Sequence, residues 1–434
     1  MEVEIAGILF LFVSFFGLLA LGVPVVYGIG ISTTCTLLLS VSGMPALTTV
    51  AQRMTTGIDS FSLLAIPFFV LAGELMKQGG IANRLINLAY ALLGRLPGGM
   101  AFVNVLSAMM FGAVSGSAVA AASAIGGIMT DRMEDEGYPR AFSASVNITA
   151  STTGLLIPPS NVLIIYALAS GGTASVASLF LAGYVPGFLV GFALILTAAF
   201  QVHRKKLPKG EKVGFAKTLT YLKESFFSLM LLVVVVGGIV AGIFTATEAA
   251  AIAVLYAGIL AFIYKTVTVK DLPSIILNSG KTTALVMAVI CTSMAMSWLF
   301  SFQSIPQFIS SLLIDNLTNP IVIILIINLT LLIVGTFMDM SPAILIFTPI
   351  FLPVVTSLGM DPVHFGMVLV LNLCIGLCTP PVGTILFVGS GVAKVSVSSV
   401  IKPLIPFLVT MIVVLLLVTY IPQISLWLPG LFGM

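Results

Sequence analysis

The sequence predicts an all-α, polytopic membrane protein built from two inverted repeats, each with a re-entrant hairpin and a broken transmembrane helix. Of its 434 residues, 59% are hydrophobic and only 8% are charged, and the mean hydropathy is +1.20. A soluble domain carries about 25% charged residues, so the composition excludes a soluble protein. Stretches of about 20 apolar residues, long enough to cross a bilayer, recur along the whole chain.

One unusual pattern occurs twice in this apolar sequence. Residues 154–161 read Gly-Leu-Leu-Ile-Pro-Pro-Ser-Asn, and residues 376–383 read Gly-Leu-Cys-Thr-Pro-Pro-Val-Gly. A Pro-Pro pair interrupts a helix, because proline has no backbone N–H and its ring clashes with the preceding turn. In hydrocarbon such a break is tolerated only where it is buried in protein or lines a cavity. Two breaks at matching positions of two halves are typical of the binding site of a secondary transporter.

The two halves match at a common spacing of about 223 residues, which indicates an internal repeat. Tyr138-Pro139 then aligns with Asp361-Pro362, and Gly112 aligns with Gly335. We therefore divide the chain into a first inverted repeat (1–202), a basic cytoplasmic linker (203–223) and a second inverted repeat (224–434). The linker holds the run His203-Arg204-Lys205-Lys206, and an excess of Lys and Arg marks cytoplasmic loops.

The expected elements follow the same order in both repeats. The first repeat should contain spans near 5–21, 25–41 and 61–76, a surface helix at 81–95, the hairpin 100–131, the broken helix 138–170 and a span at 176–202. The second should contain spans near 225–243, 247–265 and 281–301, a connecting helix at 304–316, the hairpin 320–358, the broken helix 362–392 and a final span at 401–428.

The hairpins are predicted because segments 100–131 and 320–358 are apolar but interrupted midway by small or polar residues. An arm of about 14 residues, at 1.5 Å per residue, reaches about 21 Å and stops short of the ~30 Å hydrocarbon core. Each segment is then a re-entrant hairpin whose tip lies near the midplane. The alternative is a pair of ordinary spans that pack through small residues, which are common at helix contacts in membranes.

The charge distribution supports the hairpins. With the linker in the cytoplasm and the hairpins not crossing, the basic residues at both feet of the first hairpin fall inside. The feet of the second, around Asp315 and Asp361, fall outside, and so do both chain termini. Only Arg53 departs from this pattern. Each repeat then crosses an odd number of times, so the two repeats are inverted relative to each other.

Tips and breaks that approach from opposite sides should meet near the bilayer centre. Carbonyls freed at a break suit a small cation, and helix N-termini suit an anion. The usual alternative for a Ser or Thr in an apolar helix is a hydrogen bond to the carbonyl four residues earlier. Side-chain oxygens at the predicted tips and breaks come from Ser115, Ser117, Ser160, Asn161, Thr336, Ser341 and Thr379.

Three acidic residues lie within or beside predicted spans. Asp339 lies in the second tip, where an acid is costly and therefore indicates function. Glu248 is expected to begin a helix, because acids favour the first turn, and Glu74 is expected to form a surface ion pair with Lys77. No Lys or Arg lies in the predicted core, so an anionic substrate must be neutralised by bound cations, helix ends or neutral donors.

The sequence gives no sign of an enzyme. It contains no nucleotide-binding Gly-Lys-Ser/Thr loop, no His-Glu-x-x-His pattern and no Ser/His/Asp set. Without an ATP site, the driving force must be an ion gradient or substrate flow. A channel or pore-forming structural subunit is the competing class, and an intramembrane hydrolase lacks a plausible catalytic pair.

Five segments together resemble a known family: Gly112–Ser117, Gly154–Pro159, Thr245–Glu248, the tip around Asp339, and Gly376–Pro381. The chain resembles, over its whole length, the large membrane subunit (DctM-like M subunit) of tripartite ATP-independent periplasmic (TRAP) transporters. The resemblance implies an elevator-type ion transporter fold and sodium-coupled uptake of an organic acid anion across the bacterial inner membrane, with both termini periplasmic. The hairpins and broken helices would move together against a scaffold.

The resemblance also implies partners and a substrate class. The partners are a small four-helix membrane subunit (Q subunit), expected here as a separate chain, and a periplasmic substrate-binding protein (P subunit). Family substrates include C4-dicarboxylates, sialic acid and other sugar acids, and general similarity favours sialic acid. Sodium is the only cofactor expected.

The site residues follow from placing sodium at the two breaks. The first sodium site is predicted from Ser115, Ser117 and the carbonyls of Gly154, Ile157 and Pro159. The second is predicted from the carbonyls of Gly335, Thr336 and Met338 together with Thr379 and Pro381. The candidate substrate-binding residues are Ser117, Ser160, Asn161, Asp339 and Ser341.

Overall fold

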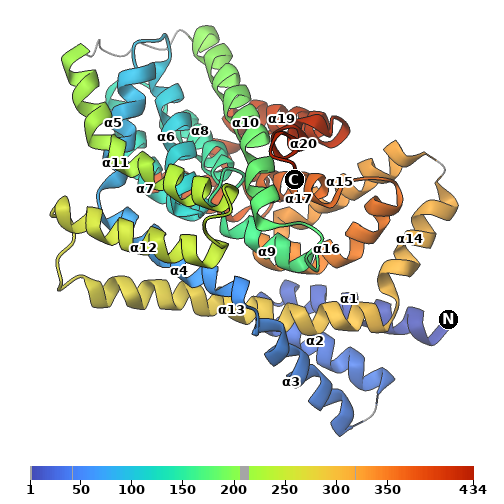
Figure 1. Ribbon diagram of the computed structural model, residues 1–434. Helices are drawn as coiled ribbons and strands as arrows, with labels where there is room; N and C mark the ends of the chain where they lie inside the picture. Colours follow the sequence, from blue (N-terminus) through green and yellow to red (C-terminus); the bar gives the residue numbers. More distant parts are fainter. Residues whose placement is uncertain (1, 42, 206–214, 318) are drawn as a thin grey trace.

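The computed structural model describes residues 2–41, 43–205, 215–317 and 319–434, and the regular elements of these residues are all helical (Figure 1). Eight of the described helices are long and apolar enough to cross a membrane. The chain is therefore an all-α polytopic membrane protein. The middle of the predicted linker, residues 206–214, lies outside the described residues, and both ends of that linker are helical.

Apart from α3, η1 and α20, the helices of the first repeat recur in the second in the same order. The first set is α1 (Glu2–Ala20), α2 (Val25–Ser40), α3 (Met44–Ile58), the 3₁₀ turn η1 (Phe61–Leu64), α4 (Ala65–Gln78), α5 (Ile81–Leu93), α6 (Gly99–Ser115), α7 (Ala118–Asp135), α8 (Arg140–Thr153), α9 (Asn161–Ala169) and α10 (Val176–Lys205). The second set is α11 (Phe215–Val240), α12 (Ala246–Ile263), α13 (Leu272–Phe302), α14 (Ile305–Asn316), α15 (Pro320–Phe337), α16 (Met340–Ser357), α17 (Pro362–Cys378), α18 (Thr384–Val392), α19 (Val397–Tyr420) and α20 (Gln423–Leu431). Both ends of α18 lie 223 residues after the ends of α9.

Both predicted hairpins form, as α6–α7 and α15–α16, but their arms are longer than expected. The arms contain 17 or 18 residues, about 26–27 Å at 1.5 Å per residue. The arms are therefore longer than the ~14 residues expected, but they are still shorter than the ~30 Å hydrocarbon core. Both tips line one cavity inside the protein, as expected for re-entrant hairpins, and α15 and α16 are also among the helices long and apolar enough to cross a membrane.

Both predicted broken helices form, and each break packs against a hairpin arm through glycine. Gly112 of α6 lies against Gly154, where α8 ends, and a Cβ on Gly112 would be 2.8 Å from the Gly154 Cα. Gly335 of α15 lies against Gly376 in the same way, with a corresponding distance of 3.2 Å. Only residues without a Cβ allow two backbones to approach this closely. The Pro158-Pro159 and Pro380-Pro381 bonds are cis.

The hairpins and broken helices form one packed body. In α8, every residue from Phe142 to Thr153 is buried. The two broken helices contact each other, and the Cys374 thiol of α17 donates to the Thr152 carbonyl of α8 (3.4 Å). Asn372 of α17 donates to Asn328 of α15 (2.8 Å), which donates to Thr419 of α19 (3.1 Å). Such buried polar networks fix the relative positions of helices because an unpaired polar group would be costly.

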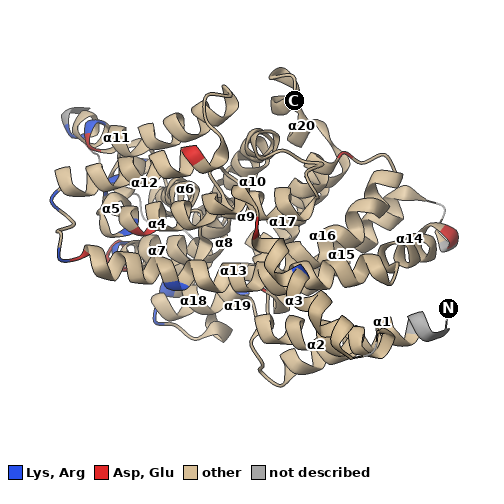
Figure 2. Cartoon of the chain, turned by 60° about the horizontal axis from the view of Figure 1, so that its bottom comes forward, with Lys and Arg blue, Asp and Glu red and all other residues tan. Residues whose placement is uncertain are grey.

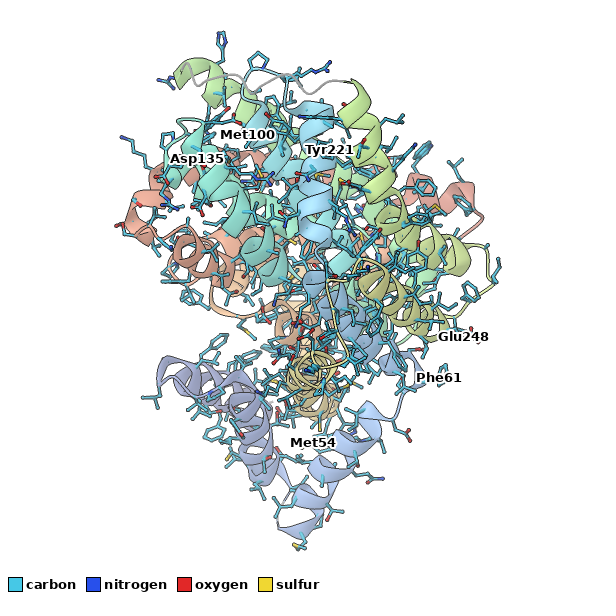
Figure 3. The ribbon with its side chains drawn as sticks, turned by 90° about the vertical axis from the view of Figure 1, so that its left-hand side faces the viewer. Met54, Phe61, Met100, Asp135, Tyr221 and Glu248 are labelled. Atoms are coloured by element: carbon cyan, nitrogen blue, oxygen red, sulfur yellow. The ribbon has the colours of Figure 1, made fainter. Side chains whose placement is uncertain are left out.

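Helices α1–α4 and α11–α13 form a second group beside this body, and α13 contacts α16 while α11 contacts α5. Helix α4 packs against α12 and α13, and α13 also packs against α2 and α3. In Figure 3, Met54 of α3 lies below Phe61 of η1 and far from Met100, where the first hairpin begins. The Thr247 hydroxyl of α12 donates to the Phe61 carbonyl (3.1 Å) and joins the two repeats within this group. We call α1–α4 and α11–α13 the scaffold.

Two parts of the chain differ from the sequence-based expectation. Helix α3 was not predicted, because its Thr-rich sequence is too polar for a span. Arg53, which departed from the charge pattern, lies on α3 with its guanidinium carbon 5.1 Å from the Trp298 ring centroid. The predicted final span is divided into α19 and α20. Helix α5 packs beside α6 and α11 with seven buried residues, and its position along the membrane surface stays a prediction.

Charged side chains gather at opposite ends of the molecule. Figure 2 shows Lys and Arg near α5, α11, α18 and the α12–α13 connection, with acidic residues among them, whereas the end that carries α14 shows acidic residues. Met100 and Asp135, the two feet of the first hairpin, lie at the same end as Tyr221 of α11 (Figure 3). Both feet of one hairpin therefore lie at the same end of the molecule.

Candidate functional site

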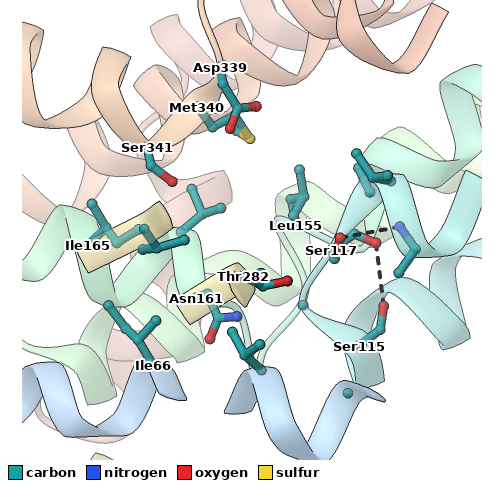
Figure 4. A pocket seen from close by; sticks show the side chains of 18 of the residues that line it. Ile66, Ser115, Ser117, Leu155, Asn161, Ile165, Thr282, Asp339, Met340 and Ser341 are labelled. Atoms are coloured by element: carbon teal, nitrogen blue, oxygen red, sulfur yellow. Dashed lines mark hydrogen bonds between the residues drawn. The ribbon is translucent and has the colours of Figure 1, made fainter. Parts of the chain in front are cut away.

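A cavity of about 430 Å³ lies where the two hairpin tips meet the scaffold (Figure 4). Its walls come from the first tip, the first break with α9, the second tip, and helices α4 and α13. The residues with polar or charged side chains that line it are Glu74, Lys77, Ser115, Ser117, Ser123, Asn161, Thr282, Asp339 and Ser341. The volume falls within the range of small-molecule sites in proteins.

The first tip turns at Gly116, whose φ of +61° favours glycine. The Ser117 hydroxyl caps α7 by accepting a hydrogen bond from the Ala120 N–H (3.2 Å), and the Ser115 hydroxyl donates to the Ser117 carbonyl (3.4 Å). Ser117 thus has a structural role at the start of a helix. Its oxygen retains a second lone pair, so a cation can still bind beside the cap.

The first break places Asn161 against this tip. A Cβ on Gly116 would be 3.4 Å from the Asn161 side-chain nitrogen. The Asn161 Oδ1 is buried and has no hydrogen-bond partner among the described residues, so it is an open acceptor beside the cavity. Ser160 was predicted to bind substrate, but it is fully buried and does not line the cavity. Its hydroxyl also has no partner among the described residues.

The second tip presents Asp339 and Ser341 to the cavity. Asp339 is the N-cap position of α16, and its side chain is exposed to the cavity although it lies deep inside the protein. In Figure 4, Asp339 and Ser341 lie across the cavity from Asn161. In this position the carboxylate can face water or a bound cation, which lowers the cost of an acid within a span.

The residues predicted for the second sodium site lie close together, but some of their polar groups already form hydrogen bonds within the protein. The Gly383 N–H donates to the Thr336 carbonyl (3.0 Å) and ties the second break to the second hairpin. The hydroxyls of Thr336 and Thr379 donate to carbonyls three and four residues earlier in their own helices (2.7 Å each). Each hydroxyl proton is therefore bound to a carbonyl of its own helix, as is common in apolar helices. The lone pairs of the hydroxyl oxygens remain free to bind a cation.

The sequence-based reasoning missed the scaffold wall of the cavity. Lys77 and Glu74 form the expected pair, with 3.6 Å between Nζ and Oε2, but both line the cavity rather than an outer surface. Nothing in the local sequence shows this, because it depends on how α4 packs beside the first tip. A Cβ on Gly73, in the same turn, would be 2.9 Å from the Ser115 carbonyl oxygen.

Glu248 has the structural role that was expected. It forms a capping box with Thr245 at the start of α12: the Thr245 N–H donates to the Glu248 carboxylate (2.8 Å), and the Glu248 N–H donates to the Thr245 hydroxyl (3.3 Å). It does not line the cavity.

Comparison with known proteins identifies the family. Residues 12–424 match the family model described as the tripartite ATP-independent periplasmic transporter, DctM component. The chain belongs to this family. Because the relatives are named as transporter permeases, the chain is a multi-pass membrane transporter component and not an enzyme.

Relatives cover almost the whole chain. YgiK of Salmonella typhimurium is 52% identical over 98% of both chains. The C4-dicarboxylate TRAP transporter large permease DctM of Rhodobacter capsulatus is 39% identical over 98% of this chain and 99% of its own. The sialic acid TRAP transporter large permease SiaM of Vibrio cholerae is 37% identical over 96% and 97%. The crystal structure of the Alcanivorax borkumensis YdaH transporter shares the fold, with a TM-score of 0.64 and 14% identity over 90% of each chain.

Proposed function

We propose that this DctM-family chain couples sodium entry to the uptake of an organic acid anion. The observation that carries the proposal is the charge of the cavity, whose lining contains two carboxylates, Glu74 and Asp339, and one ammonium, Lys77. An anion entering a cavity of net negative charge is repelled unless cations enter with it. Sodium supplies that charge and gives the transport its driving force.

The two breaks are the proposed sodium sites. Ser115 and Ser117 with the carbonyls of Gly154, Ile157 and Pro159 form the first, and the Gly335–Met338 carbonyls with Thr379 and Pro381 form the second. The proposal is supported by the glycine contacts that bring each break against its hairpin and by the preference of sodium for oxygen ligands at unwound helix segments. A structure determined in sodium that shows only water or protein side chains at both breaks would contradict it.

The substrate is proposed to occupy the cavity between Asn161, Ser117, Asp339 and Ser341. Relatives named for C4-dicarboxylates and for sialic acid are almost equally similar to this chain. Sequence identity therefore does not single out sialic acid, which stays a proposal beside C4-dicarboxylates and other sugar acids.

The proposed setting is the bacterial inner membrane, with a small four-helix membrane subunit and a periplasmic binding protein as partners. The basic end of the molecule would face the cytoplasm, as the excess of Lys and Arg favours. In this orientation the cavity opens inward, because Lys77 in the last turn of α4 and Thr282 in the first half of α13 line it.

An elevator mechanism is proposed for the conformational change. The hairpins and broken helices share buried hydrogen bonds across both repeats, whereas the scaffold packs through α4, α12 and α13. At Gly73 the two bodies touch backbone to backbone. A contact without side chains allows one body to slide past the other, and a larger residue there would oppose the conformation seen here.

Replacing Gly73 with leucine is therefore expected to shift the protein away from this inward-open conformation. Overpacking of this kind costs about 1–3 kcal/mol, and about 1.4 kcal/mol corresponds to a tenfold change in population. The measurement is the rate at which a membrane-impermeant thiol reagent, applied from the cytoplasmic side, labels a Ser123→Cys reporter in a background without native cysteines. We expect labelling to slow by about tenfold.

The matched control is Gly258→Leu in α12, because nothing lies within 4 Å of a Cβ at Gly258. Its labelling rate should equal that of the parent. Equal labelling in the Gly73 and Gly258 variants, with both folded, would show that Gly73 does not mark a contact between moving bodies.

A further inference from the structure

Lys77 is the only cationic side chain among the residues that line the cavity. It lies in the last turn of α4, on the scaffold wall. The site residues predicted from the sequence all come from the tips and breaks, so none of them supplies a fixed positive charge. The proposed cargo is an organic anion, and Lys77 is the one side chain in the cavity that can neutralise a carboxylate directly.

The contact between Lys77 and Glu74 leaves the ammonium available. The distance of 3.6 Å is longer than the 2.7–2.9 Å typical of a close charge-assisted hydrogen bond. The other carboxylate oxygen of Glu74 accepts from the Gln78 side chain (3.2 Å), which holds Glu74 in place. The side chain of Lys77 is 44% exposed and that of Glu74 is 19% exposed. An ammonium has three protons, so Lys77 can bind a second carboxylate without leaving Glu74.

The position of Lys77 on the scaffold limits when a substrate can reach it. Helix α4 packs against α12 and α13 of the scaffold, and its contact with the first tip runs through Gly73 and Ser115. If the tips carry the substrate as one body, the substrate meets Lys77 only while the tips lie beside α4. In this structure that is the inward-open arrangement.

We propose that Lys77, held by Glu74, is a stationary carboxylate-binding residue at the cytoplasmic mouth of the transport cavity. This inference rests on the proposed function. The substrate carboxylate exchanges between the tips and Lys77, which keeps its contact with Glu74 throughout. Because Lys77 shares its charge between two carboxylates, its contact with the substrate is weak and release is rapid. Lys77 therefore determines affinity from the cytoplasmic side, while the affinity from the opposite side is set without it.

The test compares the two faces of the transporter in membrane vesicles of opposite orientation. The chain and its small membrane subunit are expressed together, and radiolabelled succinate, sialic acid and gluconate serve as probes. Inverted vesicles expose the cytoplasmic face, and right-side-out vesicles with binding protein expose the other face. For Lys77→Gln we expect the half-saturating probe concentration to rise about three- to tenfold in inverted vesicles, as for loss of one solvent-accessible ionic contact. In right-side-out vesicles the half-saturating probe concentration of Lys77→Gln should stay within twofold of the parent value, because the opposite face binds the probe without Lys77.

Two variants serve as controls. Lys77→Arg keeps the charge and should restore the cytoplasmic affinity, and Lys281→Gln removes an exposed lysine of α13 that does not line the cavity. An equal effect of Lys77→Gln on both faces, or no effect on either, would overturn the inference. Absence of uptake of all three probes by the parent complex would instead overturn the proposed function, which separates the two failures.

Discussion

Replacing Gly376 with alanine is expected to abolish transport. A Cβ at this position would overlap the backbone of Gly335, with its Cα 2.5 Å away. Both atoms belong to backbone, so no side-chain rotation can relieve the overlap, and the second break must separate from its hairpin. The free energy of unfolding should fall by about 1–3 kcal/mol, measured as a lower thermal midpoint of the purified protein, and uptake should be lost.

Gly391→Ala is the matched control in the other half of the same broken helix. Nothing lies within 4 Å of a Cβ at Gly391, which is exposed in α18. Alanine there should stabilise the helix by about 0.5–1 kcal/mol and leave uptake unchanged. Gly154→Ala tests the equivalent contact of the first repeat and should behave like Gly376→Ala. Wild-type stability and uptake in both break variants would show that the glycine contacts are dispensable.

Asp339→Asn is expected to reduce uptake at least tenfold. The loss of one ionic contact in a partly desolvated site costs about 1.4 kcal/mol or more, and about 1.4 kcal/mol corresponds to a factor of ten. The substitution keeps the shape of the side chain and removes a charge that faces the cavity at the second tip. That charge attracts sodium and repels the carboxylate of a substrate, so it directs cations towards the second hairpin. The sodium concentration for half-maximal uptake should therefore rise, with the protein folded and bound to its small subunit.

Asp315→Asn provides the control, because Asp315 is exposed at the end of α14 and does not line the cavity. It should leave the sodium titration unchanged. Uptake by Asp339→Asn that matches the wild type at every sodium concentration would show that Asp339 is only a solvated residue of the tip.

The sequence predicted those parts of the fold that depend on local chemistry. Each Pro-Pro pair lies at a break because proline cannot continue a helix, and Thr245 with Glu248 begins α12 because both side chains bind free N–H groups. The tips at Gly116 and Asp339 were visible as small or polar residues in apolar segments. By contrast, α3 was not predicted, because its polar Thr and Gln residues and Arg53 do not form the apolar stretch that marks a span. The helix packs on α13.

The parts of the site that were missed depend on tertiary packing. Lys77 and Glu74 have the spacing of an ordinary helix-surface pair, and only the contact of α4 with the first tip places them in the cavity. Ser117 was predicted as an ion ligand from its position in the first tip, and the structure adds that it caps α7. Ser160 is adjacent to Asn161 in sequence, yet the turn of the break buries it away from the cavity.

Uptake by the reconstituted complex tests the central claim most directly. The chain and its small membrane subunit are placed in proteoliposomes, and the binding protein supplies radiolabelled succinate, sialic acid or gluconate. An inward sodium gradient is compared with an equal potassium gradient. We expect saturable uptake of at least one acid that requires both sodium and the binding protein. Flux that does not saturate and continues without sodium or the binding protein, as through a channel, would contradict it.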